Sequence, residues 1–318
     1  MGTWNTTFIT EFILLGFAGH PQLEKVLFVI MSLVYLVTLF GNGSILALTC
    51  LGDLSHLDSH LQTPMYFFLS NLAVLNICYT SAVVPKMLIN FLVERKSISY
   101  NFCTAQVYIT LFLGAAECIL LMVMAFDRYV AICHPLHYPT TMNKATCVSL
   151  AVGAWISSFL FSVAPSFAVK RSLCNSIVDH LFCEAPILFQ LACPGQDLSK
   201  NEVMMVAGSV LTLLLPFVLI LLSYVRIVVA VLRISSADGK RKAFSTCSAH
   251  ITVVTIYYGS GMFTYMRPQT GNSAEKDKLI SLFYSVINPM LNPIIYSLRN
   301  KDVKEAFLKV LGRTKGSQ

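Results

Sequence analysis

The sequence predicts an all-α membrane protein built as a bundle of seven transmembrane helices. The 318 residues are 55% hydrophobic and only 12% charged, whereas soluble domains carry about 25% charged residues. The uncharged residues are concentrated in seven long runs, and a spanning helix needs about 20 mostly apolar residues. Backbone polar groups stay paired in hydrocarbon only in helices or closed barrels, and the alternating pattern of barrel strands is absent. We therefore expect each run to be a helix.

These runs organise residues 1–318 as a single transmembrane domain. We expect an outer tail over 1–25, an inner tail over 299–318, and helices over about 26–51, 64–86, 97–129, 145–169, 201–233, 241–266 and 278–298. In the inner tail, Val303, Phe307, Val310 and Leu311 recur at helical spacing between basic residues. That pattern predicts a short amphipathic C-terminal helix on the inner leaflet.

The distribution of basic residues predicts that the N-terminus lies outside the cell. With that orientation 13 of the 23 basic residues lie in inner segments, and basic loops favour the cytosol. Asn5-Thr6-Thr7 is a glycosylation acceptor, which requires the outside. Met1-Gly2 with Thr6 also fits the loose myristoylation pattern, which requires the cytosol. The charge bias favours glycosylation of Asn5.

Four cysteines would then lie outside, where thiols oxidise: Cys103, Cys174, Cys183 and Cys193. Four cysteines allow three pairings. Two disulfides would order the second outer loop, roughly 170–202, which is long for a loop in a compact domain.

Polar groups within the spans indicate a functional interior. Pro216 and Pro293 should bend their helices and provide hinges. Glu117 is the one ionisable residue in mid-membrane, where such groups are costly and functional by default. Amides at comparable depth on other helices, Asn42, Asn76 and Asn292, should converge with it on a hydrated pocket. The alternative is that these groups form separate helix–helix hydrogen bonds.

No arrangement of residues suggests an enzyme, and the sequence indicates no cofactor. Serines and histidines are scattered, no glycine loop could cradle a phosphate, and no basic-aromatic stripe points to nucleic acid.

Several motifs occur in order along the predicted helices. Asp127-Arg128-Tyr129 stands at the inner end of the third helix, and Asn292-Pro293-Ile294-Ile295-Tyr296 lies in the seventh. Five segments, residues 61–72, 124–135, 223–224, 242–250 and 289–300, are spread over nearly the whole chain. The two motifs resemble those of rhodopsin-like G-protein-coupled receptors. The five segments resemble the signature strings of one family of these receptors, the olfactory receptors, in its class II, tetrapod-type branch.

The resemblance implies a multi-pass plasma-membrane receptor with an extracellular N-terminus and a cytoplasmic C-terminus. Such a receptor would bind a small, mostly apolar, neutral volatile odorant within the bundle. It would act as the transducer of olfaction by activating a stimulatory olfactory-type heterotrimeric G protein to raise cAMP. Two alternatives remain: a receptor for another small metabolite outside the nose, and a small-molecule transporter, which the lack of internal repeats argues against.

The resemblance also assigns roles at the two ends of the bundle. It implies disulfides Cys103–Cys183 and Cys174–Cys193. It implies coupling and activation roles for Asp127, Arg128, Tyr129, Tyr224, Lys240, Arg241, Asn292, Pro293 and Tyr296. Lys240 and Arg241 also suit the headgroups of membrane lipid.

Three positions depart from related patterns. Asn76 stands where the family usually has Asp, so a sodium ion at Glu117 and Asn76 would be weakly held. Lys240 stands where many rhodopsin-like receptors have an acid that pairs with the triplet arginine. Thr110 stands where amine receptors carry Asp.

A ligand site is expected in the outer third of the bundle. On the third helix, Thr110, Leu111, Gly114, Ala115 and Cys118 follow one helical face, which by resemblance lines the pocket. The facing positions would be Gly208, Ser209, Thr212, Tyr258, Gly261, Met262, Tyr265, Leu282 and Ser285. None carries a charge, and this favours a neutral ligand.

Overall fold

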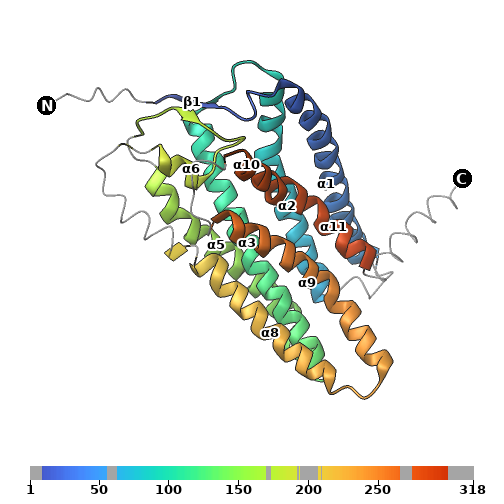
Figure 1. Cartoon of the computed structure of the whole chain (residues 1–318). Coiled ribbons are helices and arrows are strands. Elements are labelled where there is room, and N and C mark those ends of the chain that lie inside the picture. Colours follow the sequence, from blue (N-terminus) through green and yellow to red (C-terminus); the bar gives the residue numbers. More distant parts are fainter. Residues whose placement is uncertain are drawn as a thin grey trace, which may run out of the picture.

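The computed structural model describes residues 9–55, 63–169, 173–191, 193, 207–208, 210–265 and 274–299. Over these residues the protein is a bundle of long helices with a small sheet at one end (Figure 1). Asn5, Ser209 and the amphipathic helix expected over 303–311 lie outside the described residues.

Seven long helical segments make up the bundle, as the sequence predicts. They are α1 (Pro21–Ser55), α2 (Pro64–Leu92), α3 (Tyr100–Cys133), α5 (Lys144–Val169), η2 (Val210–Leu214) continuing into α8 (Leu215–Leu232), α9 (Ala237–Tyr265), and α10 (Ala274–Leu282) continuing through η3 (Phe283–Ile287) into α11 (Asn288–Arg299). Of the described helices, six are long and apolar enough to cross a membrane, and α9 is the seventh member of the bundle. Two short helices, α4 (Tyr138–Thr141) and α6 (Ala185–Gln190), lie in the loops.

Several helices extend beyond the uncharged runs that predict them. α1 begins at Pro21 rather than near residue 26, and α2 continues to Leu92, past Lys86. A charged residue marks where a span reaches the edge of the hydrocarbon, but the helix does not have to end there. A long basic side chain such as that of Lys86 can extend its charged end to water while its backbone stays helical. α3 begins at Tyr100 because the hydroxyl of Ser99 caps it, accepting a 3.3 Å hydrogen bond from the amide of Phe102.

Two spans contain a π-helical turn that the sequence does not predict. η2 immediately precedes α8, whose second residue is Pro216, and η3 lies in the middle of the last span. A π turn adds a residue to one turn of helix and so rotates the faces on either side of it. Pro293 lies inside α11, against Gly41 of α1. A Cβ on Gly41 would lie only 2.9 Å from the Cγ of Pro293, so glycine permits this close approach.

The centre of the bundle is a continuous apolar core around α3, which packs against α2, α5, α8 and α9. The outer faces are also apolar. On α1, for example, Leu33 is 59% exposed and Phe40 is 72% exposed. Exposed apolar residues over whole helices suit a bilayer rather than water.

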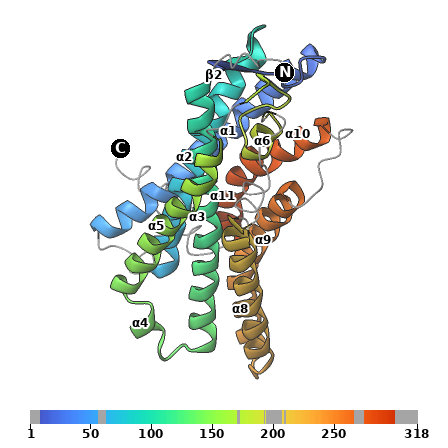
Figure 2. The same ribbon diagram turned by 90° about the vertical axis from the view of Figure 1, so that its left-hand side faces the viewer.

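Three short strands form a cap at the outer end of the bundle, opposite α4 (Figure 2). β1 (Glu11–Leu14) lies between β2 (Ser97–Ser99) and β3 (Ile177–Val178). It pairs antiparallel with β2 and parallel with β3. From the sequence, the residues of β1 and β3 are expected to be tail and loop, whereas Ser97–Ser99 are expected to open the third helix and form β2 instead. The cap therefore joins the N-terminal tail to the first and second outer loops.

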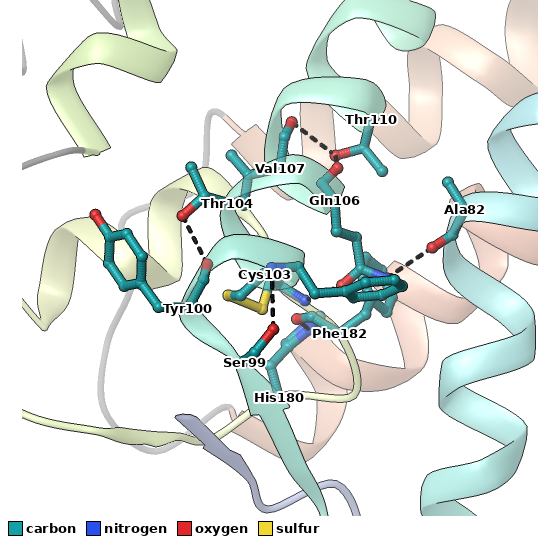
Figure 3. The surroundings of a disulfide bond; sticks show 12 residues. Ala82, Ser99, Tyr100, Cys103, Thr104, Gln106, Val107, Thr110, His180 and Phe182 are labelled. Carbon is teal, nitrogen blue, oxygen red and sulfur yellow. Dashed lines mark hydrogen bonds between the residues drawn. A yellow bond between two sulfur atoms is a disulfide. The ribbon is translucent and has the colours of Figure 1, made fainter. Parts of the chain in front are cut away.

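Two disulfides fasten the second outer loop, with the pairing that the resemblance implies. Cys103 of α3 is bonded to Cys183, and Cys174 is bonded to Cys193. Beside the first bond, the buried side chain of Gln106 joins three segments (Figure 3). Its Nε2 donates to the carbonyl of Ala82 at 2.8 Å, and its Oε1 accepts from the amide of Cys183 at 2.9 Å.

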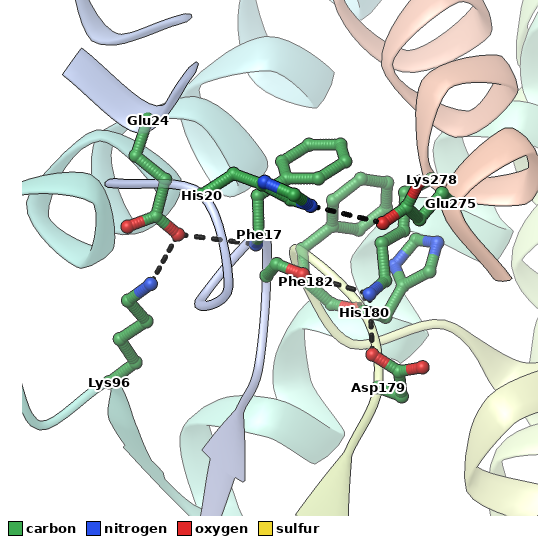
Figure 4. A network of polar contacts seen from close by, with 10 residues as sticks. Phe17, His20, Glu24, Lys96, Asp179, His180, Phe182, Glu275 and Lys278 are labelled. Carbon is green, nitrogen blue, oxygen red and sulfur yellow. Dashed lines mark hydrogen bonds and ion pairs between the residues drawn. The ribbon is translucent and has the colours of Figure 1, made fainter. Parts of the chain in front are cut away.

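Two buried lysines hold the cap to the helices (Figure 4). Lys96 pairs with Glu24 of α1, whose Oε1 also accepts from the amide of Phe17 at 3.2 Å. Lys278 of α10 pairs with Asp179 and donates to the carbonyl of Gly16 at 2.8 Å. Both lysines have neutralising partners, as buried charges require.

Candidate functional site

A cavity of about 120 Å³ lies inside the bundle beside the middle of α3. We call it the central cavity. Its lining residues come from α2, α3, η2, α9, η3 and α11: Tyr79, Thr110, Leu111, Gly114, Ala115, Glu117, Cys118, Thr212, Leu213, Tyr257, Gly261, Tyr284 and Pro289. An engineered apolar cavity of roughly 150 Å³ holds benzene. The central cavity therefore fits a compact organic molecule.

Four hydroxyl groups that line the central cavity already donate their protons to the protein. The bonds run from Thr110 to the Gln106 carbonyl at 2.9 Å, from Thr212 to the Gly208 carbonyl at 2.8 Å, from Tyr257 to the Gly114 carbonyl at 2.8 Å, and from Tyr284 to Oε1 of Glu184 at 2.7 Å. A hydroxyl has one proton and two lone pairs. The hydroxyls of Thr110 and Thr212 therefore present acceptors to a ligand, whereas that of Tyr257 already accepts from the Cys118 thiol at 3.7 Å.

The structure brings half of the expected ligand residues together around the central cavity. Those on its wall are Thr110, Leu111, Gly114, Ala115, Cys118, Thr212 and Gly261. Five others do not line it: Gly208, Tyr258, Met262, Leu282 and Ser285. Ser209 and the side chain of Tyr265 lie outside the described residues.

On α9 and in the last span, the helix face that lines the central cavity is rotated from the face that was expected to line it. On α9, Tyr257 faces the cavity. Its neighbour Tyr258 is buried against α3, and its hydroxyl donates to the Cys118 carbonyl at 3.0 Å. In the last span, Tyr284 of η3 faces the cavity, and Ser285 donates to the Ser281 carbonyl of its own helix.

Glu117 connects the central cavity to a polar cluster in the middle of the bundle. Its Oε1 accepts a 3.2 Å hydrogen bond from Nδ2 of Asn292. Nδ2 of Asn292 also lies 3.4 Å from Oδ1 of Asn76, and Nδ2 of Asn76 donates to Oδ1 of Asn42 at 3.1 Å. All four side chains are buried. The groups expected to converge are thus one network across α1, α2, α3 and α11.

The cytosolic end of α3 holds the triplet Asp127-Arg128-Tyr129. Asp127 is buried and pairs with Arg128. Its Oδ1 also accepts a 2.8 Å hydrogen bond from the hydroxyl of Tyr138 in α4. Burial and the neighbouring Asp127 carboxylate raise the pKa of the Tyr138 phenol. The hydroxyl of Tyr129 lies 3.1 Å from Nε2 of His134.

The other expected coupling residues lie on α8, α9 and α11. Tyr224 of α8 lies with its hydroxyl 2.6 Å from Nδ1 of His250, and Nε2 of His250 lies 3.1 Å from the Leu121 carbonyl. Lys240 and Arg241 lie in the first turns of α9, at least partly exposed. Pro293 and Tyr296 are buried in α11 near the polar cluster.

Sequence reasoning missed three contributors to these sites. Tyr138 follows Pro135 in a short loop, and nothing in the sequence relates it to Asp127. His250 stands out in the sequence only as the last residue of the segment 242–250. Gln106 reads as an ordinary polar residue near a helix start. All three act through partners distant in sequence or on other segments.

Comparison with known proteins places these features in a family. Residues 31–314 match the family described as olfactory receptor. The chain is 48% identical to human olfactory receptor 13C2 over 317 residues, which cover 97% of each protein. It is 47% identical to human olfactory receptor 2K2, covering 97% of this chain and 96% of the relative. It is 48% identical to human olfactory receptor 2G3, covering 98% of this chain and 99% of the relative.

Proposed function

Because the chain belongs to the olfactory receptor family of odorant-binding, multi-pass plasma-membrane receptors, we propose that its odorant is a small neutral molecule held in the central cavity. We further propose that the bound receptor activates a stimulatory heterotrimeric G protein and raises cAMP. The odorant shifts an existing equilibrium between inactive and active forms, since a ligand acts by its differential affinity for the two. The central cavity is the observation that carries this proposal.

The lining of the cavity supports a neutral ligand. Glu117 carries the single carboxyl group among the lining residues, and its Oε1 already accepts a hydrogen bond from Asn292. A charged odorant at this depth loses its hydration, which costs several kcal/mol per ion. Apolar walls with a few polar groups match the usual design of small-molecule sites.

The hydroxyls of the cavity support an odorant that donates a hydrogen bond. Thr110 and Thr212 offer lone pairs, because their protons are already bonded within the protein. An alcohol satisfies such an acceptor with its own proton. An aldehyde or ketone brings only a second acceptor. We therefore expect alcohols to be favoured over carbonyl compounds of equal size.

A cAMP reporter assay in cells expressing the receptor tests the proposal. The panel holds alcohols, aldehydes, ketones, amines and acids of matched chain length. We expect neutral compounds to dominate and each alcohol to be more potent than its aldehyde. A permanently charged compound as the most potent agonist would place the ligand elsewhere, and aldehydes equal to alcohols would contradict the hydrogen-bond argument. A parallel calcium readout through a promiscuous G protein separates failure of binding from failure to couple to the stimulatory type.

A further inference from the structure

A second hollow, of about 340 Å³, lies on the outside of the bundle between α3, α5 and α8. We call it the inner groove. Its walls are Met122, Val123, Phe126, Tyr129, Leu150, Leu219, Leu222, Ser223 and Arg226. The spacing of these residues on α3 and on α8 follows one face of each helix. The groove is therefore a continuous furrow between two facing helices, with Leu150 of α5 at its side.

The walls of the inner groove are open to the surroundings of the bundle. Phe126 is 38% exposed, Leu219 is 40% exposed and Leu222 is 56% exposed. In a membrane-spanning receptor these side chains face acyl chains rather than water. An apolar furrow of this kind fits a lipid tail.

Arg226 places a positive charge at the cytosolic end of the groove. The thiol of Cys133, the last residue of α3, donates to the backbone carbonyl of Arg226 at 3.7 Å. The two helices are therefore level at this point, which is where α3 leaves the hydrocarbon. Arg226 is exposed, and no carboxylate among the described residues forms an ion pair with it.

We propose that the inner groove binds an inner-leaflet phospholipid with an anionic headgroup. One acyl chain lies between α3 and α8 against Phe126 and Leu222, and the phosphate contacts the guanidinium of Arg226. Charge and shape agree in this assignment. The cytoplasmic leaflet carries the anionic lipids of the cell membrane, and the guanidinium matches the geometry of phosphate oxygens.

The position of the groove links this lipid to signalling. Tyr129 lines the groove and also packs against an apolar cluster formed by Ile227, Val231 and Cys247 at the inner ends of α8 and α9. A lipid seated there contacts both α3 and α8 beside the Asp127-Arg128-Tyr129 triplet. The bound lipid would therefore stabilise one relative placement of these two helices.

Lipid retention by the purified full-length receptor tests the proposal. The receptor is placed in phosphatidylcholine nanodiscs with a minor fraction of phosphatidylserine carrying the same acyl chains, and retained lipids are counted by native mass spectrometry. We expect phosphatidylserine to be retained preferentially, and Arg226→Gln to weaken that preference about fivefold, since one basic contact contributes about 1 kcal/mol. Arg226→Lys keeps the positive charge and should retain most of the preference for phosphatidylserine. This variant distinguishes loss of the charge from misfolding caused by a substitution at this position.

Two matched controls make the result specific. Arg233→Gln removes an exposed cation from the end of the same helix, outside the groove, and should leave the preference unchanged. Leu219→Trp should fill the groove and reduce retention, whereas Leu221→Trp, at a comparably exposed position on α8, should not. Equal losses in Arg226→Gln and Arg233→Gln would overturn the site in favour of general surface charge. In a further arm, dodecanoate is added to the same nanodiscs, and its retention as tightly as phosphatidylserine would reassign the groove to free fatty acids.

Discussion

Asn292 of the Asn-Pro-x-x-Tyr motif donates a 3.2 Å hydrogen bond to Glu117, and Glu117 also lines the central cavity. One carboxyl group thus contacts both the central cavity, where we propose that the odorant binds, and the segment of α11 that contains Pro293. A ligand that displaces the Glu117 side chain changes the environment of Asn292 directly. The route from binding to helix movement is therefore short, and a hinge proline lies one residue beyond it.

A second carboxylate in this cluster should create a better sodium site. Asn76→Asp places a carboxylate next to Asn292 and close to Glu117, and hard cations favour oxygen ligands with negative charge. We expect sodium to lower agonist potency more strongly in Asn76→Asp than in wild type, measured by cAMP dose–response curves at varied sodium and constant ionic strength. The matched control on α2 is Asn71→Asp, because the Asn71 side chain lies outside the cluster and accepts a hydrogen bond from Trp155. Identical sodium titrations in all three receptors would argue against an ion here.

Arg128→Ala should abolish G-protein activation and leave surface expression largely intact. The cation stands at the cytosolic end of α3, and its described ion-pair partner is its neighbour Asp127 rather than an acid on α9. We therefore also expect measurable basal cAMP in the wild type. Flow cytometry of surface receptor and the cAMP reporter are measured on the same cells. An alanine variant that signals normally would remove Arg128 from the coupling machinery.

Tyr138→Phe should raise basal cAMP. It removes the 2.8 Å hydrogen bond that holds Asp127, and a bond to a charged group contributes about 1.5–3 kcal/mol. If activation breaks that bond, the inactive-to-active ratio falls by roughly 10- to 150-fold. The pKa of the Tyr138 phenol is raised above its ordinary value near 10, so the phenol is protonated at neutral pH. It loses its proton, and with it the hydrogen bond to Asp127, only as the pH rises through that raised pKa. Titration of Tyr138 should therefore not change basal signalling between about pH 6 and 8. Equal basal cAMP in the wild type and in Tyr138→Phe would show that the hydrogen bond does not restrain the Asp127-Arg128-Tyr129 triplet.

Gly114→Leu should block odorants of the size that the central cavity holds. The added side chain projects from the wall of a cavity of about 120 Å³, and overpacking costs about 1–3 kcal/mol, or roughly 5- to 150-fold in potency. Gly114→Ala should respond nearly normally, because its Cβ would meet the Tyr257 hydroxyl at an ordinary 3.8 Å. Gly153→Leu, on an exposed position of α5 with no atom near the new Cβ, controls for the substitution itself. Unchanged dose–response curves for Gly114→Leu would show that odorants bind elsewhere.

The bundle could be predicted from the sequence because hydrocarbon imposes one rule on every span. Uncharged runs of sufficient length must be helical, so the helices are visible in composition alone. The cap could not be predicted in the same way. β1 has only four residues, and its partners β2 and β3 lie in loops far along the chain. Nothing local to Glu11–Leu14 indicates which of these segments it pairs with.

The walls of the central cavity could be predicted on α3 and only partly elsewhere. α3 is a regular helix, so spacing of three and four residues selects its inner face correctly. The faces on α8 and α11 are rotated by η2 and η3, and periodicity of 3.6 residues assumes that such turns are absent. For α9, spacing cannot distinguish Tyr257 from Tyr258, because adjacent residues differ by about 100° and the rotation of the whole helix is set by packing.

The parallel pairing of β1 with β3 has a consequence for biosynthesis. Ile13 pairs with Ile177, so the first strand leaves the ribosome 164 residues (177 minus 13) before its partner exists. At about 5–20 residues per second, the strand waits in the lumen of the endoplasmic reticulum for roughly 10 to 30 seconds, while α1, α2, α3 and α5 are inserted. Contact between Gly16 and Lys278 comes later still. β1 can therefore pair with β3 only after the second outer loop has reached the lumenal side. Until then the N-terminal segment is unpaired, and Phe12 and Leu14, which are buried in the folded receptor, are exposed to the chaperones of that compartment.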